Sequence, residues 1–403
     1  MELFWLEHKK LWRKKIVKIC VLLCFVYYVI FGSILSFQWF SFGSSDDYTS
    51  AFGNNFDGYT VIKDSQEYAL SFGGELTDET LQQIVSDYQQ MEADGMEEEL
   101  EKTDWQIVNS WLGTLYPELR DTSNYKTMIS YVDPDKLTGF YERRQQVLDE
   151  FLEVSGQVGA EKEFLHQIER KVEKPFHYEW VEGWSTLLGS MVADLGVVMA
   201  LFLGIVLSSL FAGEWHDNTS ALVLTTRNGW GKIALAKILT GLAFTVELFA
   251  LLAVSSVISQ LFFMGTAGWD MPIQNIKLIA VAPMNMLQAE IYEYAFVLLG
   301  AIGFAGIVMF ISAAVKNNVL TLLLSLAVVY GPMMIAEYLP YGMQKALDLI
   351  PLVGSSTDIF RTNTFRIFGK LIWSPYLLIT IPVLIGILCM PFAIKSWSRR
   401  MKA

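Results

Sequence analysis

The chain has 403 residues, of which 53% are hydrophobic and 14% aromatic, and its formal net charge is -12. Residues 38–185 hold 30 acidic and 11 basic side chains, whereas basic side chains outnumber acidic ones in the remainder. This segregation excludes an ordinary soluble enzyme and indicates an acidic soluble block set between apolar, basic segments. We expect no nucleic-acid partner.

The first element, residues 1–15 (MELFWLEHKKLWRKK), mixes apolar and basic side chains. This mixture is typical of an amphipathic helix in the inner headgroup layer of a membrane. A charged flank that only sets the orientation of the next segment is an equal alternative.

Six apolar runs are each long enough to cross a bilayer, which takes roughly 20 residues. They cover residues 16–37, 185–212, 234–263, 290–315, 318–338 and 373–394. The first has no small-residue cleavage site after it, so we interpret it as an uncleaved span. The sequence therefore predicts an all-α polytopic membrane protein with six transmembrane helices: the first at 16–37 and five more within 185–403.

Orientation follows from basic residues near the span ends. Six lysine and arginine residues lie between positions 9 and 18, and four follow position 394. Both termini are then cytoplasmic and the cell membrane is the expected location. The acidic block, 38–184, becomes an extracellular domain.

This outer domain is expected to be mostly α with a small sheet (α+β). Helical periodicity marks about 78–91, 132–154 and 160–174, and short β patterns mark 59–64 and 67–72. The three cysteines all lie in apolar runs, so no disulfide framework is predicted.

Catalytic and metal-binding motifs are missing. Gly231-Lys232 comes closest to a phosphate-binding loop, but Ile233 follows where serine or threonine belongs. No HExxH, GxSxG or paired-cysteine motif is present, and His166 and His177 lack the spacing of metal ligands. We expect no catalytic residue, no metal ligand and no cofactor bound by this chain.

Two acids lie within predicted spans: Asp194 in the second and Glu247 in the third. A carboxylate in hydrocarbon is costly, so each should face the bundle interior, water or a partner. Both are candidates for a translocation path or a proton-coupled switch, with a buried hydrogen bond between spans, or an acid kept neutral, as an equal alternative. Gly300, Gly303 and Gly306 form a small-residue surface suited to close helix packing.

A polar, glycine-marked loop, residues 213–233, separates the second and third spans on the cytoplasmic side. An acid is followed four and five residues later by two small polar residues, then by leucines, a turn with a basic residue, and a lysine in the next span. The positions are Glu214, Asn218, Thr219, Leu222, Leu224, Arg227, Lys232 and Lys237.

This pattern, with six spans, a basic amphipathic N-terminus and an outer domain after the first span, resembles the ABC-2 type permease family. Asn218 replaces the usual glycine, and the turn lacks the proline of many relatives, as in a Gram-positive branch. The outer domain resembles nothing that we can name.

The resemblance implies that this chain is the permease subunit of an ATP-driven exporter. The loop would form a coupling helix that docks on a separate ATP-binding subunit, which holds ATP and magnesium. A second permease, identical or paralogous, would complete the exporter, and peptides or amphiphilic compounds are the expected cargo or resistance target. An ion-coupled carrier that uses Asp194 and Glu247, or a receptor that senses ligands with the outer domain, are the alternatives.

Overall fold

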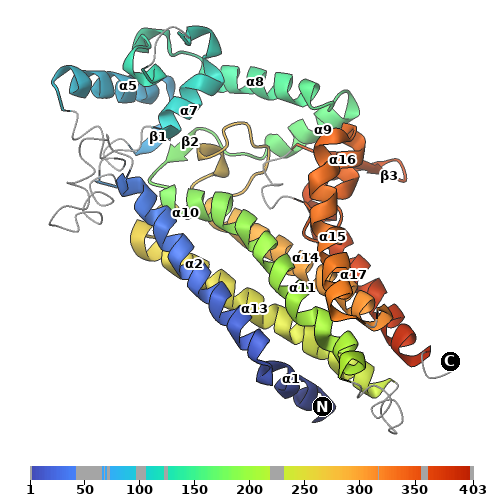
Figure 1. The fold of residues 1–403 in the computed structure, drawn as a ribbon. Coiled ribbons are helices and arrows are strands. Elements are labelled where there is room, and N and C mark those ends of the chain that lie inside the picture. Colours follow the sequence, from blue (N-terminus) through green and yellow to red (C-terminus); the bar gives the residue numbers. More distant parts are fainter. Residues whose placement is uncertain are drawn as a thin grey trace, which may run out of the picture.

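The computed structural model describes residues 2–41, 66–67, 69, 73–96, 106–121, 126–217, 231–315, 317–354 and 362–399. Long helices lie side by side in a bundle, and a smaller domain caps one end of it (Figure 1). The bundle helices are α1 (Glu2–Arg13), α2 (Lys15–Ser41), α11 (Val192–His216), α13 (Lys232–Met264), α14 (Met286–Ala314), α15 (Asn318–Ile335) and α17 (Ser374–Arg399).

Five helical stretches are long and apolar enough to cross a membrane: Glu182–His216, Lys232–Met264, Met286–Ala314, Asn318–Tyr338 and Ser374–Ser398. They match the five spans expected after the outer domain. The first of them joins α11 to the short helix α10 (Glu182–Thr186) through a π-helical turn. This is the architecture of a mostly helical, polytopic membrane protein.

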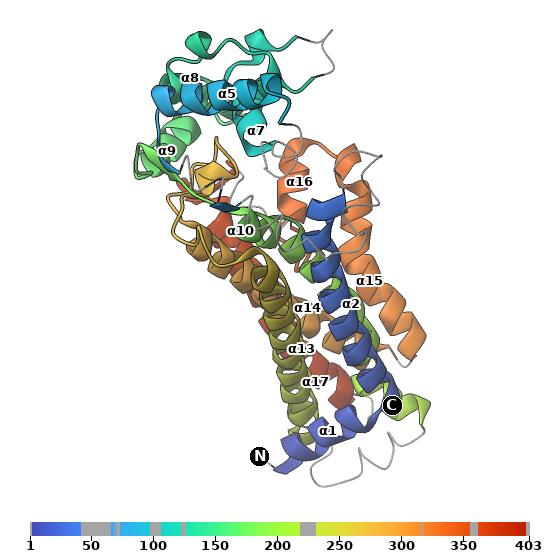
Figure 2. The same ribbon diagram turned by 90° about the vertical axis from the view of Figure 1, so that its left-hand side faces the viewer.

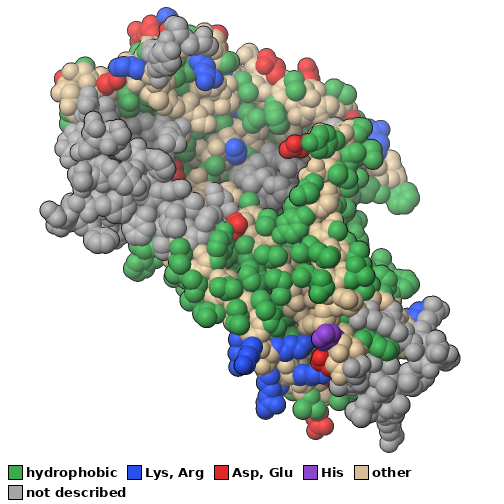
Figure 3. Space-filling model, viewed as in Figure 1, with side chains coloured by type: hydrophobic (Ala, Val, Ile, Leu, Met, Phe, Trp, Pro, Cys, Tyr) green, Lys and Arg blue, Asp and Glu red, His purple; other side chains and the backbone are tan. Residues whose placement is uncertain are grey.

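The run expected to span first, 16–37, falls within α2, which packs against α13. The outward side of α2 is apolar, since Leu22 and Ile30 are more than half exposed. Figure 3 shows hydrophobic side chains over the middle of the bundle, with lysines and arginines gathered at the lower end. A sixth span at α2 stays a prediction.

The small residues of α14 let its backbone touch that of α17, as the sequence predicts. A Cβ added at Gly303 would lie 2.3 Å from the carbonyl oxygen of Pro382. One added at Gly306 would lie 2.4 Å from that of Gly386, whose own added Cβ would lie 2.5 Å from the Cα of Gly303. Only glycine fits at these three positions, because the atoms that an added Cβ would meet first are main-chain atoms, which cannot rotate away.

The capping domain consists of short elements around its own core. They are β1 (Gly74–Leu76), α5 (Asp78–Ala93), α7 (Gln106–Leu115), α8 (Phe140–Val154), α9 (Ala160–Glu169) and β2 (Phe176–Tyr178), with 3-10 turns at Pro117–Leu119, Met128–Ser130 and Pro134–Lys136. In α5, which lies where the sequence predicts a helix, the apolar face is buried through Leu81, Ile84 and Val85. Its first residue, Asp78, accepts hydrogen bonds from the backbone N–H groups of Gly139 and Phe140 and so fixes the start of α8.

Two local expectations for this domain need correction, and a third, the strand at 59–64, lies outside the described residues. The helix expected from 132 begins only at Phe140, because Pro134–Lys136 forms a separate turn and Gly139 has a left-handed φ of 72°. The strand expected at 67–72 is wrong where the structure describes it, since residues 67 and 69 are helical. The sheet instead pairs β1 with β2 in antiparallel fashion, about 100 residues apart in sequence.

The domain is attached to the bundle through the α13–α14 connection, residues 265–285, which we call the seat loop. Arg144 of α8 is fully buried and donates from Nε to the carbonyl oxygen of Leu278 at 2.6 Å and from Nη2 to that of Ala280 at 3.2 Å. Trp111 donates to the carbonyl oxygen of Asn275 at 3.1 Å. The domain therefore has a fixed seat on the bundle.

Beyond α15, the chain forms a short helix and a hairpin near this same end (Figure 1). The helix is α16 (Tyr341–Leu347), and the hairpin pairs β3 (Thr364–Ile367) with β4 (Lys370–Trp373). Arg366 of β3 forms an ion pair with Glu161 of α9 at 2.6 Å. The hairpin thereby makes a second link between the bundle and the capping domain.

Candidate functional site

The candidate site lies at the bundle end that carries both chain termini and the α11–α13 connection (Figures 1 and 2). Residues 218–230 of that connection fall outside the described residues. Five of the loop positions singled out from sequence belong to it: Asn218, Thr219, Leu222, Leu224 and Arg227. The other three, Glu214, Lys232 and Lys237, are described.

Glu214 and Lys237 bind each other where α11 and α13 meet the loop. Lys237 Nζ lies 2.9 Å from Glu214 Oε1 and donates also to the carbonyl oxygen of Leu210 at 3.1 Å. Their side chains are only 5% and 2% exposed, respectively. An ion pair so enclosed needs its remaining hydrogen bonds satisfied, and α1 completes them.

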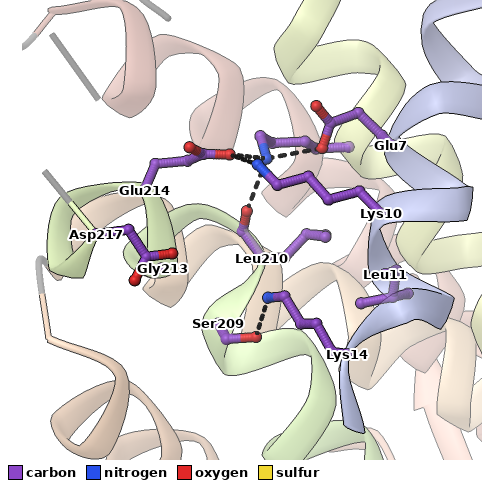
Figure 4. A pocket seen from close by; sticks show the side chains of 10 residues that line it. Glu7, Lys10, Leu11, Lys14, Ser209, Leu210, Gly213, Glu214 and Asp217 are labelled. Atoms are coloured by element: carbon purple, nitrogen blue, oxygen red, sulfur yellow. Dashed lines mark hydrogen bonds and ion pairs between the residues drawn. The ribbon is translucent and has the colours of Figure 1, made fainter. Parts of the chain in front are cut away.

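Helix α1 supplies one acid and one base to this pair (Figure 4). Lys10 Nζ lies 2.6 Å from Glu214 Oε1, and Glu7 Oε2 lies 2.9 Å from Lys237 Nζ. The result is an alternating set of two carboxylates and two ammonium groups from α1, α11 and α13, which we call the inner ion cluster. It holds together three helices that are distant in sequence.

The cluster also sets the electrostatics of α1. Burial alone would lower the pKa of Lys10, but its hydrogen bond and attraction to Glu214 outweigh burial and raise that pKa above 10.5. Lys14, which donates to Ser209 Oγ at 3.0 Å, has its pKa lowered by burial and then by repulsion from Lys237 and Lys10. Lys10 is thus held as a cation, and the charge of Lys14 is less favoured.

The three described residues at the ends of the loop therefore differ in whether they are available to a partner subunit. Glu214 and Lys237 bind within the chain, whereas Lys232 at the start of α13 is exposed. Sequence reasoning did not assign Glu7 or Lys10 to this site. Their spacing of three residues, which places them on one face of α1, was the available signal.

The two acids expected within spans, Asp194 and Glu247, contact different helices. Tyr27 of α2 donates to Asp194 Oδ1 at 3.2 Å. Glu247 of α13 lies 3.1 Å from His8 Nε2 and accepts from Trp12 Nε1 at 3.0 Å, both in α1. In the described part of the chain no hydrogen bond joins Asp194 to Glu247. The two acids therefore belong to two separate helix contacts.

Sequence reasoning missed two further acids, Glu290 and Glu293, in the first turns of α14. Both are buried, at 4% and 0% exposure. Their signal was two acids three residues apart at the start of a predicted span, which places them on one helix face.

Among the described residues, no group of three His, Cys, Asp or Glu side chains is arranged to hold a metal ion. Comparison with known proteins assigns no family to the chain, because no family model, curated protein or solved structure matches it.

Proposed function

We propose that this chain is the membrane-spanning permease subunit of an ABC-2 type exporter, with both termini and loop 213–233 in the cytoplasm and the capping domain outside. A separate subunit binds ATP and magnesium and drives transport through the loop. The loop pattern, the bundle of apolar helices and the segregation of charge support this proposal.

The observation that carries the proposal is the inner ion cluster. It binds the two ends of the loop to each other and to α1 through Glu214, Lys237, Glu7 and Lys10. A loop without a mechanical role does not need this ion cluster, since a hairpin between two packed helices is already held at both ends by the packing of those helices. A displacement of residues 218–230 by another subunit would be transmitted through the inner ion cluster to α1, α11 and α13 together.

Docking on the ATP-binding subunit would use the loop residues that lie between Glu214 and Lys237 in sequence and are not part of the inner ion cluster. Leu222 and Leu224 offer apolar contact, and Arg227 and the exposed Lys232 offer cations to carboxylates of the ATP-binding subunit. Glu214 serves as the internal anchor of the loop.

A second permease has room to bind along α15, because only 17% of the apolar part of that helix is buried. Its exposed side chains include Val319, Leu323 and Met334, at 65%, 59% and 76% exposure. We assign this face to the permease–permease interface. The assignment of peptides or amphiphilic compounds as cargo rests on the family resemblance alone.

The substitution L222D should abolish docking. A charge placed in the apolar centre of an interface costs about 2 kcal/mol or more, which lowers affinity by at least about 30-fold. We would measure how much of the ATP-binding subunit copurifies with the chain in detergent.

The matched control is V154D, which places the same charge on a side chain that is 89% exposed in the capping domain. It should copurify like the wild type. Undiminished copurification of L222D, or transport by the wild type that is indifferent to ATP and follows an ion gradient, would contradict the proposal.

The double substitution E7A/K10A should separate docking from transport. It removes the α1 half of the inner ion cluster but leaves the loop and the Glu214–Lys237 pair in place. We expect unchanged copurification of the ATP-binding subunit and about fivefold less transport per ATP hydrolysed, equivalent to roughly 1 kcal/mol of lost coupling.

E2A/K9A is its control, since it removes the same two charge types from exposed positions of α1. Transport per ATP should then match the wild type. Equal losses in both double variants would mean that removing any acid and base from α1 impairs coupling and that the cluster has no role of its own.

A further inference from the structure

The turn between β3 and β4 presents an aromatic side chain to the outside of the protein. Phe368, at the tip of this hairpin, has a relative exposure of 102%, so no described residue covers its ring. Its φ is 48°, and that of the next residue, Gly369, is 79°. Two positive φ values mark a type I′ hairpin turn, whose first position favours asparagine or glycine over a bulky side chain. The tip therefore combines an unfavourable backbone conformation with an apolar ring in solvent.

The base of the hairpin is fixed to the protein, which determines where the tip lies. Lys345 of α16 donates from Nζ to the carbonyl oxygen of Thr364 at 2.7 Å. The backbone N–H of Ser374 donates to the carbonyl oxygen of Asn363 at 2.9 Å, and Arg366 is held by its ion pair with α9. These contacts hold the strands and leave the turn projecting from them.

The hairpin lies at the depth of a lipid headgroup layer, because β4 leads directly into α17. The apolar stretch Ser374–Ser398 has 25 residues. Its length of about 38 Å exceeds the hydrocarbon core of roughly 30 Å, so its first residues belong to the headgroup layer. Tyr376, which is 60% exposed, is an aromatic residue typical of that layer. Figure 1 shows β3 directed sideways, away from the bundle, so the tip stays close to this depth.

The turn also carries an available cation. Lys370 pairs with Ile367 in the register, so these two residues flank the turn, and the side chain of Lys370 is exposed. In the part of the chain that the structure describes, no ion pair involves Lys370, whereas Arg366 is already paired with Glu161. The anions of a headgroup layer are lipid phosphate groups, which bind ammonium groups through charge-assisted hydrogen bonds. Lys370 therefore suits a lipid headgroup.

The small size of the exposed feature favours a lipid occupant over a protein one. A covered aromatic side chain buries about 150–250 Å². A stable protein interface buries about 800 Å² on each partner. The tip offers one ring and one cation, and its second turn residue, Gly369, has no side chain. A lipid leaflet needs no larger surface, because single aromatic side chains insert at its interface.

We propose that the tip of the β3–β4 hairpin is a lipid anchor in the leaflet on the capping-domain side. The Phe368 ring inserts at the boundary between headgroups and acyl chains, and Lys370 binds a lipid phosphate. Transfer of the ring out of water offsets the unfavourable φ of Phe368. Because Arg366 of the same hairpin pairs with Glu161, the anchor also holds the capping domain at a fixed height above the membrane. The anchor does not depend on the proposed exporter function.

Photo-crosslinking from the tip tests the proposal. The photoreactive residue p-benzoylphenylalanine, which keeps the phenyl ring, would replace Phe368 in the full chain. The protein would be reconstituted in vesicles of mixed phosphatidylcholine and phosphatidylglycerol and irradiated. Mass spectrometry of the intact chain should show an adduct with one phospholipid. The absence of a lipid adduct, or a cross-link to a second copy of the chain in its place, would overturn the proposal.

Position 154 is the matched control, because Val154 is 89% exposed but belongs to α8 of the capping domain. The same photoreactive residue there should give at least about tenfold less lipid adduct, since cross-linking requires contact with the lipid. Equal amounts of lipid adduct at the two positions would overturn the proposal.

K370Q tests the role of the cation. Phosphatidylglycerol has a net negative charge and phosphatidylcholine has none, so the ammonium group favours phosphatidylglycerol. Its loss should lower the share of phosphatidylglycerol among the adducts at position 368 by about fivefold. K136Q, which removes an exposed lysine of the capping domain, should leave that share unchanged. An unchanged share in K370Q would contradict the assignment of Lys370.

Discussion

Alanine in place of Gly306 should prevent correct packing of α14 on α17. The added Cβ would stand 2.4 Å from the carbonyl oxygen of Gly386 and 2.7 Å from its Cα. Main chain cannot rotate away as a side chain can, so the helices must separate along their contact. We expect a loss of about 3 kcal/mol, the upper range for overpacking, measured as the yield of monodisperse protein and its thermal unfolding in detergent.

Gly331 of α15 provides the comparison, because nothing lies within 4 Å of a Cβ added there. G331A should unfold at the wild-type temperature or slightly above it, since alanine favours helix by about 1 kcal/mol over glycine. If G306A were as stable as G331A, α14 and α17 would not touch through their backbones.

Methionine in place of Arg144 should release the capping domain from the seat loop. The substitution leaves the carbonyl oxygen of Leu278 without its donor and weakens the neutralisation of Glu169, whose Oε1 lies 2.6 Å from Arg144 Nη1. Breaking such a buried pair costs about 3–5 kcal/mol. Limited proteolysis should cut the capping domain much faster, while the bundle fragment stays intact.

R143M is the adjacent control. Arg143 pairs with Glu118 at the surface, where both side chains are partly exposed, and such a pair contributes about 1 kcal/mol or less. Proteolysis of R143M should therefore resemble that of the wild type. If R144M resists protease equally well, the domain is held by other contacts.

The buried pair of Arg144 and Glu169 predicts how low pH affects the capping domain. Burial by itself would raise the pKa of Glu169, but hydrogen bonds from Lys174 and Arg144 outweigh burial and hold it below 4.5. A carboxyl group whose pKa is lower in the folded state than in the unfolded chain stabilises the fold when the pH is above its unfolded-chain pKa. This contribution is lost as the pH falls through the folded-state pKa. Protease resistance of the wild type should therefore fall below about pH 4.5, and R144M should show a smaller change with pH.

The sequence predicted the parts of the fold that depend on local composition. Long apolar runs located five helices, and the period of Leu81, Ile84 and Val85 gave the buried face of α5. Gly303 and Gly306 were correctly assigned to a close helix contact.

Features that depend on distant segments were not predictable in this way. β1 and β2 have three residues each, and only their pairing makes them strands. Likewise, α8 reads as an amphipathic helix, but Arg144 lies in the middle of its buried face because the seat loop supplies acceptors from more than 130 positions away.

The inner ion cluster shows the same limit for the site. Helices α11 and α13 are apolar on all sides, so periodicity does not show which face is buried. Glu214 and Lys237 therefore looked available to a partner subunit. They pair with each other across the α11–α13 contact, and α1 adds Lys10 and Glu7 to that pair, which no pattern within α11 or α13 encodes.

Helix α13 joins the two ends of the molecule without a break. It runs for 33 residues with no proline, a length of about 50 Å at 1.5 Å per residue. Lys237 lies near one end, and the seat loop of the capping domain begins directly after the other. If α13 tilted as a rigid rod about its middle, the seat loop would move in the opposite sense to the inner ion cluster, and a fluorescent label on the capping domain would report movements at the far end of the bundle.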